Sequence, residues 1–272
     1  MLLDVDRYRV HPGDFSLSAV DVRETQGWEK AKARKYLRGL KNEIAGYQER
    51  LYAEGKQSVL LIFQAMDAAG KDSTIAELTS GINPQGCRVS SFKSPSKEEL
   101  AHDYLWRIHA ETPQSGMIRI FNRSHYEDVL IVRVHGWVPA ETISSRYRHI
   151  NEFERTLHDN GTRIVKVMLH ISPEYQLVRF KRRLELPDKW WKFNPADLEE
   201  RKYWKDYMEA FEIAMNRCSS EYAPWYVVPA ERKWFRTMVV AKILRDLLAK
   251  MDPQYPKPSW DPGEWTVDRL IG

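Results

Sequence analysis

The sequence predicts an α/β fold in three layers, in which a five-stranded parallel sheet lies between two layers of helices. Short apolar runs alternate with longer segments whose apolar residues recur every three or four positions, and such alternation of strands with helices is typical of parallel sheets. The run SVLLIFQ at 58–64 is unbroken, as in a strand buried on both faces. Unusual polar motifs follow three of the runs, at the strand ends where parallel sheets bind ligands.

The elements are expected in the following order along the chain. Residues 1–26 are irregular, and an amphipathic helix over 27–54, with Leu37 and Leu40 on its apolar face, ends at Gly55. Strands are expected at 58–64, 87–92, 116–122, 162–172 and 225–230. Helices are expected from Lys71 onward and over 97–110, 124–132, 139–159, 173–185, 196–217 and 232–250. The elements predict one domain over 27–250 and an irregular tail over 251–272.

The composition narrows the class of protein and its partners. A net charge of +4 and a pI near 8.9 favour an anionic partner. Nucleic-acid-binding proteins usually carry a stronger basic bias, so no nucleic acid is expected. No apolar run reaches the roughly 18 residues of a membrane span, and charges from Asp4 onward argue against a signal peptide. Two cysteines are too few for a disulfide framework, which fits a reducing cytoplasm.

The segment AMDAAGKD, residues 65–72, has the pattern of a phosphate-binding loop with two residues changed. The usual pattern is G-x-x-x-x-G-K-[ST] between a strand and a helix, but Ala65 replaces the first glycine and Asp72 replaces the hydroxyl residue. Backbone N–H groups at a helix start bind anions. The residues expected to bind phosphate are therefore Ala68, Ala69, Gly70, Lys71 and Asp72. The alternative is a plain strand–turn–helix with solvated acids.

Two carboxylates of this loop are candidate metal ligands. A carboxylate among N–H groups aimed at phosphate is costly unless a cation lies between them, which favours Asp67 as a ligand of Mg²⁺. Asp72 is either a second hard oxygen ligand or a cap of the following helix.

The motif NRSHYED begins at the end of the third predicted strand. Asn122 can bind Mg²⁺ through its carbonyl oxygen but brings no charge. The planar fork of Arg123 matches phosphate oxygens. The strand end is thus predicted to face the phosphate-binding loop.

Several residues after Arg123 can be explained by structural roles. Ser124 and Glu127 have the spacing of a capping box, which we favour over a direct catalytic role. His125 is expected to be a packed ring, since a metal site would need partner ligands at suitable spacing. Asp128 and Arg133 either face the site or pair on a helix surface.

A basic segment follows the fourth strand and its helix. Six basic residues lie between 179 and 192, and only Glu185 and Asp188 oppose them. The pattern predicts a helical lid over about 181–200 whose cations close over phosphates, unless the segment is a solvated helix end. Trp190 and Trp191 would either stack on a base or anchor the lid.

Four segments together resemble the polyphosphate kinase 2 family, and the resemblance runs from residue 27 to about residue 250. They are AMDAAGKDSTI, FNRSHYEDVL, RRLELPDKWWKF and YAPWYVVPA, and the second is similar to the class III members. The resemblance implies a P-loop kinase fold and Mg²⁺-dependent transfer of phosphoryl groups between inorganic polyphosphate and nucleotides, taking AMP to ADP and ADP to ATP. It also implies a homodimer or homotetramer.

The family's functional positions carry over to four residues, Asp67, Lys71, Arg123 and Arg183. Many members have Asp where this chain has Asn122, which bears on how the metal is held. We predict a polyphosphate groove that also includes Arg133, Arg182 and Lys189. The residues expected near the nucleotide are Asn122, Glu127, Asp128 and Lys192. Two other activities remain open on the sequence, an ATP-dependent nucleotide or nucleoside kinase and a non-catalytic polyanion-binding protein.

Overall fold

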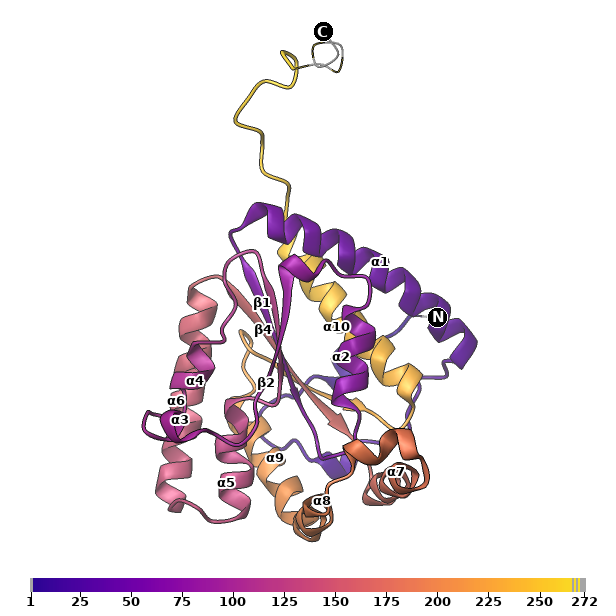
Figure 1. The fold of residues 1–272 in the computed structure, drawn as a ribbon, viewed down its shortest axis with the longest axis vertical. Coiled ribbons are helices and arrows are strands. Elements are labelled where there is room, and N and C mark those ends of the chain that lie inside the picture. The colour runs from indigo at the N-terminus through magenta and orange to yellow at the C-terminus, as the bar shows by residue number, and fades with distance from the viewer. Residues whose placement is uncertain (1, 266, 268, 270–272) are drawn as a thin grey trace.

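The structure is a computed structural model that describes residues 2–265, 267 and 269. Its sheet has five strands in the order β2-β3-β1-β4-β5, and all four neighbouring pairs are parallel (Figure 1). The strands are β1 (Ser58–Gln64), β2 (Cys87–Ser91), β3 (Ile118–Asn122), β4 (Thr162–His170) and β5 (Trp225–Pro229). The predicted α/β fold with a five-stranded parallel sheet is confirmed.

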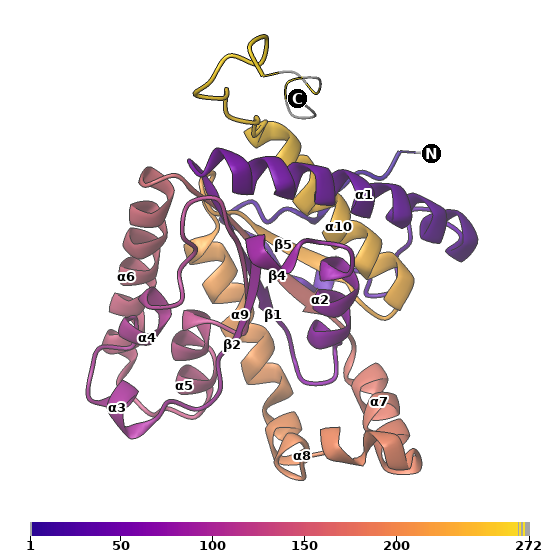
Figure 2. The same cartoon turned by 45° about the horizontal axis from the view of Figure 1, so that its top comes forward.

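Helices cover both faces of the sheet (Figures 1 and 2). One face packs against α1 (Lys30–Glu54), α2 (Lys71–Thr79) and α10 (Lys233–Met251). The other packs against α5 (Ile131–Val134), α6 (Ala140–Asp159) and α9 (Trp204–Cys218). The helices α3 (Lys97–Leu100) and α4 (Trp106–His109) lie beside α6, whereas α7 (Pro173–Glu185) and α8 (Ala196–Glu200) lie beyond the carboxyl ends of the strands.

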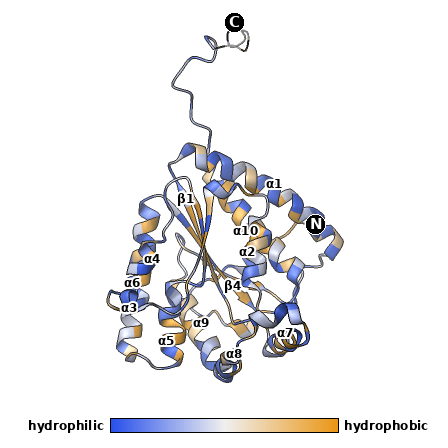
Figure 3. Cartoon of the chain, in the orientation of Figure 1, coloured by the Kyte–Doolittle hydropathy of each residue, from blue (hydrophilic) through white to orange (hydrophobic). Residues whose placement is uncertain are grey.

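The central strand β1 contributes to the cores on both faces. Successive side chains of a strand point to opposite faces, so Leu61 and Phe63 join the cluster with α1 and α10. Leu60 and Ile62 join a cluster on the other face with Phe121. All seven residues of β1 are buried, as the unbroken apolar run predicts, and Figure 3 shows apolar residues concentrated along the strands.

A polar network is buried between β4 and α6. Lys166 and Glu154 are fully buried, with Nζ 2.5 Å from Glu154 Oε2. Lys166 also donates to the carbonyl of Cys218 at 2.6 Å and to the hydroxyl of Tyr126 at 2.9 Å. The Tyr126 hydroxyl and His125 Nε2 reach the other Glu154 oxygen at 2.9 and 3.3 Å. His125 is therefore a packed ring, as expected, and the network fixes the residues that follow Arg123.

The prediction of one helix over 97–110 is wrong, because the segment forms two short helices, α3 and α4. Ser96 and Glu99 form a capping box that begins α3. Asp103 then accepts a hydrogen bond from the N–H of Leu105 at 3.0 Å, and such a local turn competes with a continuous helix. Leu100 is consequently 69% exposed while Ile108 is buried, so they do not share one face.

The helix expected over 124–132 is also interrupted. Residues His125–Val129 form a 3₁₀ helix, η4, and Leu130 separates it from α5. The expected capping box does not form, because the Ser124 hydroxyl accepts from the N–H of Tyr126 at 3.2 Å. The Glu127 carboxylate lies 3.7 Å from Arg123 instead. The expected helix 196–217 is likewise divided into α8, the 3₁₀ helix Arg201–Tyr203 and α9.

The N-terminal segment is irregular but packed. It contains the 3₁₀ helices Asp6–Tyr8 and Leu17–Ala19, and Leu3 and Tyr8 are buried in the core. After α10 the chain is irregular over 252–265, and most of the last residues of the predicted tail lie outside the described residues. Within the described part of the chain, no helix is both long and apolar enough to cross a membrane.

Candidate active site

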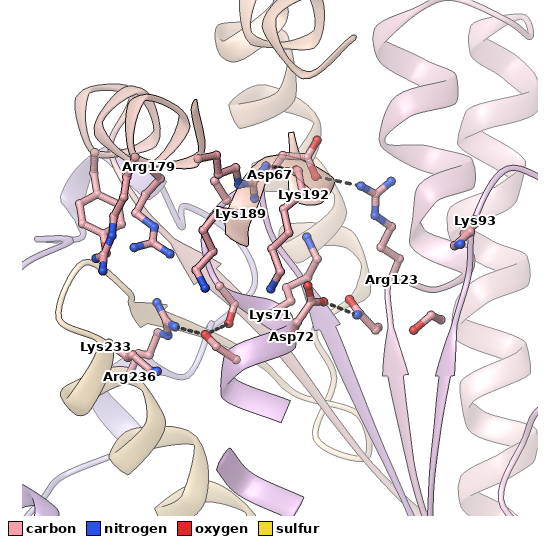
Figure 4. Close-up of a pocket in the computed structure, with 18 of the residues that line it drawn as sticks. Asp67, Lys71, Asp72, Lys93, Arg123, Arg179, Lys189, Lys192, Lys233 and Arg236 are labelled. Carbon is pink, nitrogen blue, oxygen red and sulfur yellow. Dashed lines mark hydrogen bonds and ion pairs between the residues drawn. The ribbon is translucent and has the colours of Figure 1, made fainter. Parts of the chain in front are cut away.

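A strongly basic pocket of about 880 Å³ opens where the loops after β1, β2, β3 and β5 meet α7 (Figure 4). Its acidic lining residues are Asp67 and Asp72. Its ten basic ones are Lys71, Lys93, Arg123, Arg179, Arg182, Arg183, Lys189, Lys192, Lys233 and Arg236. Ten basic groups against two carboxylates make the pocket suited to a ligand with several negative charges.

The phosphate-binding loop adopts its turn without the first glycine. The positive φ angles of the loop fall on Ala68 (65°) and Gly70 (102°), not on Ala65, so alanine introduces no left-handed strain at that position. The helix α2 begins at Lys71 directly after Gly70, which brings the free N–H groups of its first turn to the pocket that residues 70–73 line.

Lys71 is held within the loop. Its side chain is buried, and Nζ donates to the carbonyl of Ala65 at 2.9 Å. Burial and then the charge of Arg123 lower the pKa of Lys71, and Asp67 opposes this shift. A bound anion would therefore favour the charged form of the lysine.

Two polar pairs connect the loop to the end of β3. Asp67 Oδ1 lies 2.9 Å from Arg123 Nη2, and Asp72 Oδ1 accepts from Asn122 Nδ2 at 2.8 Å (Figure 4). Asp72 is thus bonded to Asn122 rather than acting as the helix cap. Arg123 has a φ of 65°, which is unusual for a side chain of this size, and its N–H donates to the carbonyl of Phe63 at 3.0 Å.

The oxygen atoms near these pairs are suited to a hard divalent cation. Asp67, Asp72 and Asn122 line the same pocket, and the side chain of Asn122 carries a carbonyl oxygen. Mg²⁺ is normally held by one or two carboxylates together with the phosphate oxygens of a substrate, and this donor set fits that description. Over the described residues no cluster of three or more His, Cys, Asp and Glu side chains could hold a metal ion.

The segment predicted as a lid places its basic residues at the pocket. Arg182, Arg183, Lys189 and Lys192 all line it. Arg183 Nη1 donates to the carbonyl of Lys192 at 2.9 Å and lies 3.1 Å from Asp197 Oδ2, which joins α7 to α8.

The two lid tryptophans are bonded to the lid backbone. The indole N–H of Trp190 donates to the carbonyl of Leu184, and that of Trp191 to the carbonyl of Asp188. Both acceptors lie within the lid, and the two rings are 59% and 78% exposed, so these bonds fix the indole groups relative to the lid backbone.

Four predicted site residues, Ala69, Glu127, Asp128 and Arg133, do not line this pocket. Glu127 lies 3.7 Å from Arg123 instead. Arg133 pairs with Glu209 at 3.1 Å and lines separate hollows beside α6 and α9. Asp128 pairs with Arg146 at 3.5 Å, and its burial raises the pKa to about 6 although Arg146 opposes the shift. The side chain of Ala69 is buried under the loop. Arg133 and Asp128 thus pair with other residues, because η4 and α5 turn them away from the end of β3.

Three basic lining residues were not expected from the sequence, and a fourth, Arg179, was counted in the basic segment but not assigned to the site. Lys93 follows β2, Lys233 and Arg236 follow β5, and Arg179 lies on α7. The rule that ligands bind at the carboxyl ends of parallel strands applies to all five strands, so it could have indicated the first three. These residues belong to no recognisable sequence motif, and they lie near Lys71 only in the folded structure.

A parallel sheet with a strand–loop–Gly-Lys–helix unit and a cationic pocket at its carboxyl edge defines a P-loop kinase-like protein. More narrowly, the chain belongs to the polyphosphate kinase 2 family, because the family model described as "Polyphosphate kinase 2" matches residues 17–256.

Individual relatives agree with this assignment. The chain is 50% identical over 255 residues to an AMP/ADP-polyphosphate phosphotransferase of Meiothermus ruber, covering 93% of this chain and 96% of the relative. It is 48% identical to an ADP-polyphosphate phosphotransferase of Rhodopseudomonas palustris, covering 81% of each. The crystal structure of polyphosphate kinase 2 from Arthrobacter aurescens TC1 superimposes with a TM-score of 0.93 at 43% identity, covering 98% of this chain and 95% of that one.

Proposed function

We propose that this protein transfers the terminal phosphoryl group of inorganic polyphosphate to AMP and to ADP, giving ADP and ATP. The observation that carries the proposal is the ten basic groups that surround a phosphate-binding loop in a chain of this family. The phosphate chains of polyphosphate and of the nucleotide each carry several negative charges and repel each other when they meet end to end. The basic residues of the pocket offset this repulsion.

The residues of the pocket act by positioning and by electrostatics. A phosphate oxygen of AMP or ADP is already ionised near neutral pH, so it attacks the terminal phosphorus of polyphosphate without a general base. The bond from that phosphorus to its bridging oxygen breaks, and the shortened polyphosphate leaves as an anion. Lys71 and Arg123 stabilise the charge on the transferred group, and Arg183 does so from the lid.

A divalent cation, Mg²⁺, would be held mainly by Asp67, with Asn122 near it. When bound, the ion supplies charge neutralisation between the two phosphate chains. Asp67 Oδ1 is 2.9 Å from Arg123 Nη2, so the carboxylate would be shared between that guanidinium and the cation.

Asp67→Asn is expected to weaken Mn²⁺ binding in the presence of tripolyphosphate by about tenfold or more, because it removes the charged ligand and keeps its shape. Electron paramagnetic resonance of free Mn²⁺ measures this directly. Asp72→Asn makes the same charge change in the same pocket and should have a smaller effect. Equal Mn²⁺ titrations for Asp67→Asn and the wild type would show that Asp67 is not the ligand.

We propose one domain over 27–250 with a lid over about 181–200 that closes on bound phosphates, and a homodimer or homotetramer, as the family resemblance implies. A cytoplasmic location is supported by Cys87 and Cys218, which are free thiols. Light scattering after gel filtration measures the number of copies.

The function is tested with purified protein, Mg²⁺, polyphosphate and either AMP or ADP, with no ATP supplied. Chromatography of the nucleotides should show ATP from both acceptors. An ATP-dependent kinase would form no product without ATP. A polyanion-binding protein would form no product with or without ATP.

A further inference from the structure

A buried arginine lies directly beneath the phosphate-binding loop. Arg236, in the first turn of α10, is only 4% exposed. Its guanidinium donates to the carbonyls of Ala69 and Ala230 at 2.9 and 3.2 Å. It also donates to the hydroxyls of Thr74 and Ser73 at 2.9 and 2.6 Å. Arg236 thus ties the loop, α2 and the end of β5 together through neutral acceptors.

The charge of Arg236 has no acidic partner in the described part of the chain, where no carboxylate oxygen lies within 4.0 Å of its nitrogens. Arg119, which is also buried, instead pairs with Glu111 at 2.8 Å. Burial lowers the pKa of Arg236 to about 10, which Tyr175 opposes and Arg179 reinforces. A buried charge without a counter-ion is costly, so its position beneath the loop calls for an explanation.

The guanidinium is close to the loop backbone, without a side chain between them. A Cβ atom at Gly70 would lie 2.3 Å from Arg236 Nη2, and the φ of 102° at Gly70 would also strain any residue with a side chain. Arg236 lines the pocket, and Figure 4 shows it pointing toward the loop from the side opposite Arg123.

We propose that Arg236 is a positioning residue whose counter-ion is the phosphate chain of the substrate. The inference rests on the proposed phosphoryl transfer. The hydrogen bonds of Arg236 hold the turn of the loop. When a condensed phosphate chain occupies the loop, the buried cation attracts it through a few atoms of low-dielectric protein, where the interaction is much stronger than in water. The hydrogen bonds of Arg236 thus stabilise the loop, whereas its charge attracts the phosphate chain.

Two substitutions separate the charge from the hydrogen bonds. Arg236→Gln keeps a donor to the loop and removes the charge, whereas Arg236→Lys keeps the charge with fewer donors. Arg119→Met is the matched control, a buried arginine outside the pocket. Isothermal calorimetry with tripolyphosphate measures binding to each full-length variant, after thermal unfolding shows that each one is folded.

Arg236→Gln should weaken tripolyphosphate binding at least about tenfold, and Arg236→Lys should stay within about threefold of the wild type. The KM for polyphosphate should rise with the same pattern. Equal losses in both variants, or none in Arg236→Gln, would overturn the charge role. Should Arg236→Gln not fold, a loss of tenfold or more in Arg236→Lys alone overturns it, and retained binding supports it. The binding result is independent of turnover, so an enzyme inactive with polyphosphate would refute only the proposed function.

Discussion

Lys71→Ala is expected to lower kcat with polyphosphate as donor by about 10²–10³-fold, the usual effect of removing one donor to the transferred group. The reason lies in the contacts of the lysine. Its ammonium donates to a single backbone carbonyl, that of Ala65, and it lies at the helix start where the phosphates are expected. Its cation is therefore available to the substrate rather than committed to the fold.

The same substitution should cost only about 1 kcal/mol of unfolding free energy, since it removes one hydrogen bond. Lys41→Ala is a suitable control, because Lys41 is also largely buried but pairs with Glu77 outside the pocket. Steady-state kinetics and urea unfolding of the two variants separate catalysis from stability. A kcat for Lys71→Ala within about threefold of the wild type would contradict the assigned role.

Glu154→Gln is expected to lower the free energy of unfolding by about 3–5 kcal/mol, because it leaves the buried charge of Lys166 without a counter-ion. Both side chains are fully buried, with Nζ and Oε2 2.5 Å apart. Burial opposes ionisation of Glu154, but Lys166 and His125 outweigh it and hold its pKa below the ordinary value. The ion pair is thus part of the folded state at neutral pH.

Urea unfolding measures this loss, and the double variant Glu154→Gln with Lys166→Met is the control. Removing the second charge should restore most of the stability, since a neutral pair avoids the isolated buried cation. A loss below about 1 kcal/mol in Glu154→Gln would show that the lysine finds another partner or is neutral. The network also holds His125 and Tyr126, which follow Arg123 in the chain. The kcat of Glu154→Gln should therefore fall together with its stability.

The sheet could be predicted from the sequence because buried strands leave a strong signal. The run 58–64 matches β1 in both bounds, and the helix 173–185 matches α7, where Pro173 fixes the start. Helices were predicted less well where side chains bond the backbone and interrupt the helical hydrogen bonds. In 97–110 the side chain of Asp103 bonds a nearby N–H group, and no periodicity of apolar residues shows that contact.

The site was predictable where its residues follow one another in the chain. The loop from Asp67 to Asp72 and the pair Asn122–Arg123 lie together in the pocket as expected. Arg133 does not, because one turn of 3₁₀ helix changes the direction of the helix that follows. Arg236 was missed because its role depends on the packing of α10 beneath the loop, which only the tertiary structure specifies.

The most direct test of the account follows the phosphoryl group itself. Polyphosphate labelled with ³²P is mixed with unlabelled ADP, Mg²⁺ and excess protein, without ATP, and nucleotides are separated after one turnover. Direct transfer from polyphosphate predicts label in the terminal phosphate of ATP in proportion to the ATP formed, and little label as orthophosphate. Label released as orthophosphate without labelled ATP, or transfer that requires added ATP, would contradict it.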